Sequence, residues 1–175
     1  MNASSPPRSI AVTGSTGLVG RRLVDDLTSQ GWEVRRVVRT ETGREGRREG
    51  RSEAGGEGGA ELKGAALGEW PQISWDPARG WMDGEGLEGV EAVVHLAGEN
   101  LAAGRWNPAR KAAIRDSRVQ GTDLLCRTLA GLRLKPRVLV SASAIGIYGH
   151  TGSEWADEAS PPGSGFLARV CRDWA

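Results

Sequence analysis

Three glycines near the amino terminus have the spacing of a phosphate-binding turn. They are Gly14, Gly17 and Gly20, in the segment Thr13-Gly-Ser-Thr-Gly-Leu-Val-Gly20. The first glycine allows a tight turn, the second lets the backbone approach a pyrophosphate, and the third permits close packing of a helix. The negative charge of the pyrophosphate would then lie at the helix amino terminus. A glycine turn with another role in a doubly wound protein remains the alternative.

The residues around this turn predict the elements that it needs. Ser9 to Thr13 is a short apolar run typical of a buried strand, and Glu33 to Val38 is a second strand. Between them, Gly17 to Gln30 has a helical pattern that stops at Gly31. The apolar stripe of this helix comprises Leu18, Val19, Leu23, Val24 and Leu27. Such a βαβ unit implies a parallel sheet with a right-handed crossover.

Arg39 follows the second strand, where the adenosine ribose of a dinucleotide would lie. An acidic residue there would accept a hydrogen bond from the ribose 2′-hydroxyl and favour NAD, but the first acid is Glu41. A guanidinium instead forms charge-assisted hydrogen bonds with a 2′-phosphate. We therefore expect NADP (NADPH) as the preferred cofactor, with NAD possible. A solvated arginine at the strand end is the alternative, because Arg35 and Arg36 also occur here.

Further strands and helices are predicted after residue 72. The expected elements are strands at Ile73 to Asp76, Val90 to Leu96 and Arg137 to Val140, and helices at Asn107 to Leu132 and Phe166 to Trp174. The long helix should bury Ala113, Ile114, Val119, Leu124, Leu125 and Leu129. Pro108 suits its first turn.

Residues 40–68 have a different composition from the rest of the chain. They are mostly Gly, Glu and Arg, and such a segment cannot bury enough apolar surface to offset its chain entropy. We expect a disordered surface insertion, and a flexible amino terminus at residues 1–8. Runs of Arg and Gly can contact RNA, but here glutamates cancel the charge and no aromatic residue intervenes. We therefore do not expect the chain to bind nucleic acid.

The remaining composition favours one globular domain, residues 9–175. The chain has 175 residues, a formal net charge of +1 and no apolar run long enough to cross a membrane. Cys126 and Cys171 are far apart and form no CxxC pair, so neither a disulfide nor a metal site is expected. We expect a cytoplasmic protein, and import into an organelle is left open.

Six segments in fixed order resemble one protein family. They are TGSTGLVG, VVR, HLAGEN, RWN, DSRVQGT and SASAIGIYG. Together they resemble the atypical extended short-chain dehydrogenases/reductases, the subfamily of epimerase family proteins, and the run of GEN, RW and SR is the narrowest part of the match. The resemblance implies an α/β fold, a Rossmann-type doubly wound parallel sheet. It also implies that the chain is truncated at its carboxyl end and lacks the substrate-binding region, which would leave an open sheet edge that favours homo-oligomers.

The resemblance also implies which residues contact the cofactor. The pyrophosphate loop would comprise Gly14, Thr16, Gly17, Leu18, Val19 and Gly20, the ribose contact Val38 and Arg39, and the loop after the fourth strand Leu96, Ala97 and Gly98. Arg118 matches an arginine on the cofactor side of the long helix, with a plain surface arginine as the alternative. His95 is interpreted as a satisfied core or strand-end histidine and not as a proton shuttle.

The catalytic residues are where the sequence departs from the wider superfamily. Ser143 matches the serine that hydrogen-bonds substrate, but the Tyr-x-x-x-Lys pair is absent. Tyr148 matches the loop after the fifth strand and not the catalytic tyrosine. The resemblance instead assigns the Tyr-x-x-x-Lys slot to Phe166-Leu-Ala-Arg169, with phenylalanine in place of the tyrosine and arginine in place of the lysine. The leading hypothesis is an NADP-binding oxidoreductase or nucleotide-sugar epimerase-like protein whose substrate is unknown and whose active site is incomplete. The alternative is a non-catalytic NADP-binding sensor or partner-binding module.

Overall fold

A computed structural model describes residues 8–40 and 71–174. The flexible segment predicted at residues 1–8 and the insertion predicted at 40–68 therefore lie, apart from Arg8 and Thr40, outside the described residues.

The described residues form a six-stranded sheet with the order β4-β3-β2-β1-β5-β6. Its strands are β1 (Ser9–Thr13), β2 (Glu33–Arg39), β3 (Gln72–Asp76), β4 (Trp81–Met82), β5 (Ala92–His95) and β6 (Val138–Ser141). All neighbours are parallel except β4, which pairs antiparallel with β3. The five parallel strands match the predicted ones to within two residues. The sequence did not predict β4, because two residues are too short for a periodic pattern.

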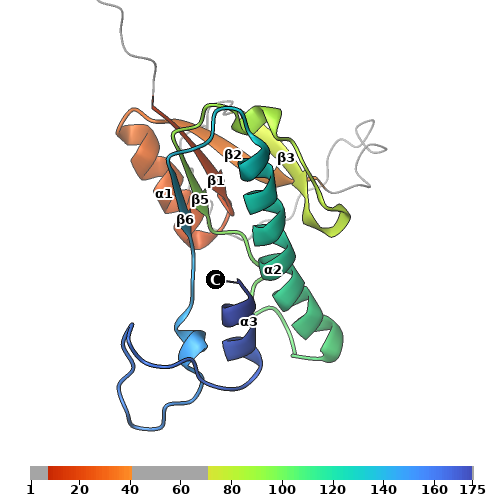
Figure 1. Ribbon diagram of the computed structural model, residues 1–175, viewed down its shortest axis with the longest axis vertical. Coiled ribbons are helices and arrows are strands. Elements are labelled where there is room, and N and C mark those ends of the chain that lie inside the picture. The colour runs from red at the N-terminus through yellow and green to blue at the C-terminus, as the bar shows by residue number, and fades with distance from the viewer. Residues whose placement is uncertain (1–7, 41–70, 175) are drawn as a thin grey trace, which may run out of the picture.

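The helices cover both faces of this sheet (Figure 1). Helix α1 (Leu18–Ser29) lies on one face, α2 (Pro108–Gly131) lies on the other, and α3 (Phe166–Trp174) packs beside α2. Short 3-10 turns occur at η1 (Pro77–Arg79), η2 (Glu85–Leu87) and η3 (Ile145–Tyr148). The Rossmann-type doubly wound fold is thus confirmed. No helix in the described ranges has the length and hydropathy to span a membrane.

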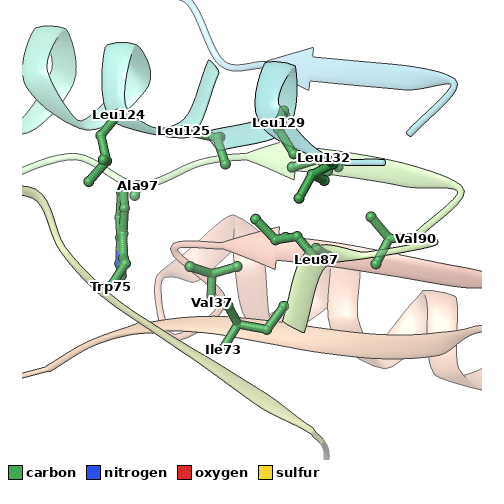
Figure 2. Packing of buried hydrophobic residues seen from close by; sticks show 12 residues of the cluster. Val37, Ile73, Trp75, Leu87, Val90, Ala97, Leu124, Leu125, Leu129 and Leu132 are labelled. Carbon is green, nitrogen blue, oxygen red and sulfur yellow. The ribbon is translucent and has the colours of Figure 1, made fainter. Parts of the chain in front are cut away.

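Two apolar clusters hold these layers together. On the α1 face, Ile10 and Val12 of β1 pack with Val24 and Val34. On the α2 face, Trp75 and other side chains of the sheet face the leucines of α2 (Figure 2). Every residue of β1 is buried, as a central parallel strand covered on both faces requires.

Two of the predicted helix faces differ from the structure. In α1, Leu18 and Val19 are 92% and 65% exposed, because the buried positions Gly20 and Val24 fix the face turned to the sheet and the first turn points away from it. In α2, Ala113 is exposed and Val119 is half-buried, whereas Ile114 and the three leucines are buried as expected.

Strand β6 is an edge of the sheet and is exposed along its whole length. Val138 and Val140 are each 51% exposed, on the face that also carries Ala92 and Val94 of β5. An edge strand with apolar side chains and unpaired backbone groups is a template for association with another chain.

We expect Val140→Lys to weaken concentration-dependent self-association, because a charge on an edge strand opposes pairing with a second strand. Light scattering after gel filtration of the two chains at equal concentration measures it. Leu134→Lys is the matched control, since Leu134 is also 51% exposed but lies outside the strand. Equal association of all three proteins would contradict the prediction.

Candidate functional site

Most of the predicted site residues lie at or just after the carboxyl ends of the parallel strands. The glycine-rich turn follows β1, Arg39 ends β2, Leu96 to Gly98 follow β5, and Ser143 follows β6. Parallel strands place all of these carboxyl ends together. The strand order reverses between β1 and β5, and in open α/β sheets ligands bind in the crevice at this switch point.

The turn after β1 depends on its glycines for steric reasons. Gly14 has a φ of +67°, and a Cβ there would lie 2.7 Å from the Leu96 carbonyl carbon. A Cβ on Gly20 would lie 2.2 Å from the Gly14 carbonyl oxygen. The third glycine therefore permits close packing of the helix on the turn itself. A Cβ on Gly17 would meet only the Gly14 oxygen, at 3.3 Å, so a ligand can approach the backbone there.

Helix α1 begins at this turn without a side-chain cap. Gly17 is its N-cap residue, it has no side chain to accept the first backbone N–H groups, and no acidic residue occupies the first turn. The helix dipole and these free N–H groups favour an anion at this end. The Thr16 carbonyl oxygen accepts a hydrogen bond from Arg21 Nε at 2.8 Å, which holds the turn against the first turn of α1.

A buried hydrogen-bond network joins this turn to the loop after β5. The Thr13 hydroxyl oxygen accepts the backbone N–H groups of Leu96 and Ala97, each at 3.1 Å, and lies 2.7 Å from His95 Nδ1. His95 Nε2 lies 3.0 Å from the Thr122 hydroxyl of α2, and Trp75 packs edge-on against the ring. The network therefore links β1, β5 and α2 at the carboxyl edge of the sheet.

These contacts fix the tautomer of His95. Two N–H groups occupy the lone pairs of the Thr13 oxygen, so its hydroxyl proton is donated to His95 Nδ1. The ring proton then lies on Nε2 and is donated to Thr122. Burial lowers the pKa of His95 from the ordinary 6.5 to about 4, so the ring is neutral near pH 7. The interpretation of His95 as a satisfied core histidine is confirmed.

Helix α2 clamps the loop at residues 98–101. Ser117 Oγ accepts the backbone N–H of Glu99 at 3.0 Å, and Arg118 donates to the Glu99 carbonyl oxygen at 3.2 Å. Arg110 pairs with the Glu99 carboxylate at 2.6 Å and donates to the Asn100 carbonyl oxygen. Arg118 is thus no plain surface arginine: its guanidinium lies against Gly98 and stacks 5.4 Å from the centre of the Trp174 ring.

Phe166 begins α3, at the position that the resemblance assigns to the missing tyrosine. Its ring packs edge-on against Trp106, with centroids 5.9 Å apart, and Lys111 Nζ lies 5.5 Å from its centroid. Arg169 does not replace the lysine as the sequence suggested, because it lies three residues after Phe166 and is exposed. The residue four positions on is Val170, which is buried.

Ser143 lies in the exposed loop between β6 and η3. The described residues give its hydroxyl no hydrogen-bond partner, and its catalytic role stays a prediction. Within the described ranges, no three His, Cys, Asp or Glu side chains come together as a metal site needs.

Sequence reasoning missed the side chains that hold these loops in place. They are Thr13, Ser117, Thr122 and Arg110. Thr13, Ser117 and Thr122 lie inside the six motif segments, but their partners are remote in sequence and are known only once the chain folds.

We expect Gly20→Ala to lower the free energy of unfolding by about 2–3 kcal/mol, because the new methyl group overlaps the Gly14 carbonyl group. Urea denaturation measures the change. Gly131→Ala at the end of α2 is the control, since a Cβ there meets nothing within 4 Å and alanine favours a helix. If both substitutions changed the free energy of unfolding by similar amounts, the close approach of Gly20 to the Gly14 carbonyl group would not be the cause.

The neutral His95 should also make stability depend on pH. The unfolded chain binds the proton more readily than the folded chain, so the stabilisation is complete above pH 6.5 and falls as pH decreases toward 4. Between pH 7 and pH 5 we expect a loss of about 2 kcal/mol that His95→Asn lacks. Urea denaturation at both pH values checks this. His150→Asn, a change at an exposed histidine, should keep the full loss, and a loss unchanged in His95→Asn would contradict the assignment.

The comparisons with known proteins agree with this geometry. Residues 10–168 match the family model described as the NAD dependent epimerase/dehydratase family. The chain is 34% identical over 165 residues to epimerase family protein Mb2239 of Mycobacterium bovis, and 34% identical over 169 residues to the chloroplastic SDR39U1 homolog of Arabidopsis thaliana. These matches cover 94% of this chain but 46% and 42% of the relatives. The chain thus spans about half the length of the curated relatives that it matches.

Two solved structures are similar in sequence as well as in fold. One is a nucleoside-diphosphate sugar epimerase from Corynebacterium glutamicum, with a TM-score of 0.65 and 35% identity, covering 97% of this chain and 30% of that one. The other is human epimerase family protein SDR39U1 with NADPH, with a TM-score of 0.66 and 26% identity, covering 95% and 47%. From the glycine-rich turn, the strand order and these matches, we conclude that the chain belongs to the NAD dependent epimerase/dehydratase family.

Proposed function

We propose that this chain binds NADP at the switch point of its sheet, as the nucleotide-binding part of an oxidoreductase or nucleotide-sugar epimerase-like protein. The observation that carries the proposal is the uncapped amino terminus of α1 behind Gly14 and Gly17. Free N–H groups and an open backbone at Gly17 suit a pyrophosphate. The NADPH in the structure of the human relative supports the same cofactor class.

The preference for NADP over NAD rests on charge at the end of β2. Arg39 is exposed there, and no carboxylate among the described residues pairs with it. A 2′-phosphate would gain charge-assisted hydrogen bonds from this guanidinium, whereas a ribose 2′-hydroxyl would gain little. Val38 and the loop from Leu96 to Gly98 would border the nucleotide, and Arg118 would hold that loop in place.

When bound, the cofactor would supply hydride transfer to or from a carbonyl or carbinol carbon. We propose that Ser143, in the loop after β6, would hydrogen-bond such an oxygen. Phe166 offers no proton, so the proton donor would be a different group. We also propose that the substrate is a small molecule, that the protein forms homo-oligomers and that it is cytoplasmic.

A non-catalytic NADP-binding module is the second candidate. Phe166 and the buried Val170 favour it, because together they remove the tyrosine and the lysine of the usual proton relay. Binding of NADPH without turnover of any carbonyl compound in a broad panel would favour this candidate, and turnover would favour the first.

We expect NADPH to bind at least about tenfold more tightly than NADH, and Arg39→Gln to remove most of that difference by weakening NADPH alone. Nucleotide fluorescence titrations of the 175-residue chain measure both dissociation constants. Arg127→Gln, which removes an exposed charge paired with Asp123 on α2, should change neither. A chain that is folded by circular dichroism but binds neither nucleotide would overturn the proposed function.

A further inference from the structure

Strand β2 carries three arginines whose surroundings differ. Arg35 forms an ion pair with Glu33 at 2.9 Å and donates to the carbonyl oxygens of Gly86 and Glu88. Its charge and donors therefore have a structural explanation. Arg39 is exposed at the strand end and has its role in the proposed function. Among the described residues, Arg36 has no acidic partner and only one hydrogen-bond acceptor, Ser15 Oγ. The positive charge of Arg36 therefore has no structural explanation of the kind found for Arg35.

The position of Arg36 points to the turn after β1. Side chains alternate along a strand, so Arg36 lies on the same face as Val34, which packs with Val12 and Val24 under α1. Arg36 Nε donates to Ser15 Oγ at 3.1 Å. Ser15 belongs to the glycine-rich turn and is only 4% exposed. This bond holds the half-buried guanidinium of Arg36 against the segment proposed to cradle the cofactor phosphates.

A half-buried guanidinium without a carboxylate is costly unless an anion offsets the loss of water. Its Nε donates to Ser15, while its two terminal amino groups make no hydrogen bond or ion pair with the described residues. Arg39 lies three positions further along β2 and, by alternation, on the opposite face of the strand. The two guanidinium groups therefore flank the carboxyl end of β2 from its two faces.

We propose that Arg36, oriented by Ser15, is a second specificity-determining residue that contacts the adenosine 2′-phosphate together with Arg39. This inference rests on the proposed binding of NADP. Arg39 is exposed and by itself offers a positive charge to the 2′-phosphate. A second guanidinium fixed by Ser15 adds a pre-organised donor pair, which loses less side-chain freedom when the phosphate binds.

The test is the ratio of the dissociation constants of NADH and NADPH for the 175-residue chain. Arg36→Gln keeps a donor for Ser15 but removes the charge, and should weaken NADPH about tenfold while leaving NADH unchanged. Arg36→Lys should recover part of the loss, because it restores the charge without the planar fork. Arg127→Gln serves as the surface-charge control.

Two further variants keep the inference testable if Arg36→Gln does not fold. Ser15→Ala is a small change that frees the Arg36 side chain, and should reduce the NADPH preference by a smaller factor than Arg36→Gln. Arg36→Gln combined with Arg39→Gln should lose less than the product of the single losses, since both residues contact one phosphate group.

The possible results distinguish this inference from the proposed binding of NADP. If the wild-type chain shows no preference for NADPH, both the NADP assignment and the role of Arg36 are overturned. A wild-type preference that survives unchanged in folded Arg36→Gln, or in Ser15→Ala where Arg36→Gln does not fold, overturns the role of Arg36 alone. Equal weakening of NADH and NADPH would also overturn it, because it would reveal a general effect on the turn.

Discussion

The hydroxyl group of Thr13 is the contact on which the site depends most. It accepts the N–H groups of Leu96 and Ala97 and donates to His95, so one buried oxygen ties the end of β1 to the loop after β5. Gly14 then approaches the Leu96 carbonyl group too closely for any side chain. The spacing between the two loops at the switch point is thereby fixed by polar contacts inside an apolar core, where an unpaired group would be costly.

The second layer of support comes from α2, and it explains why three short motifs occur together. GEN contributes Glu99, whose carboxylate, N–H and carbonyl oxygen each contact α2 through Arg110, Ser117 and Arg118. RW contributes Trp106, which packs on Phe166 and donates through Nε1 to the Leu101 carbonyl oxygen. SR contributes two of the clamping side chains. The motifs form one physical unit that holds the loop at the sheet edge, and a change in one part would leave partners unpaired in the others.

Positive charge gathers at the carboxyl ends of the strands, where the site lies. The carboxyl ends of the strands present the open amino terminus of α1 together with Arg36 and Arg39 of β2, while Arg35 on the same strand is paired with Glu33. A ligand with several phosphates fits this pattern better than a neutral one. By contrast, Phe166, which the resemblance assigns to the position of the usual tyrosine, packs its ring edge-on against Trp106 with Lys111 Nζ nearby, and a phenyl ring has no proton to transfer.

The sequence by itself determined the five parallel strands, the three α-helices and the loops that carry the site, but not the short antiparallel strand β4. It did so because strand and helix periods, glycine spacing and helix start signals are local properties of the chain. Tertiary structure decided which side chains meet. The sequence placed Leu18 and Val19 in the apolar stripe of α1, but both are exposed because tertiary packing decides which face of the helix meets the sheet. The assignment of Arg169 to the lysine slot was wrong for a different reason, since the residue four positions after Phe166 is Val170. The partners of Thr13, His95 and Arg36 lie 21 to 84 residues away, a separation that no local pattern bridges.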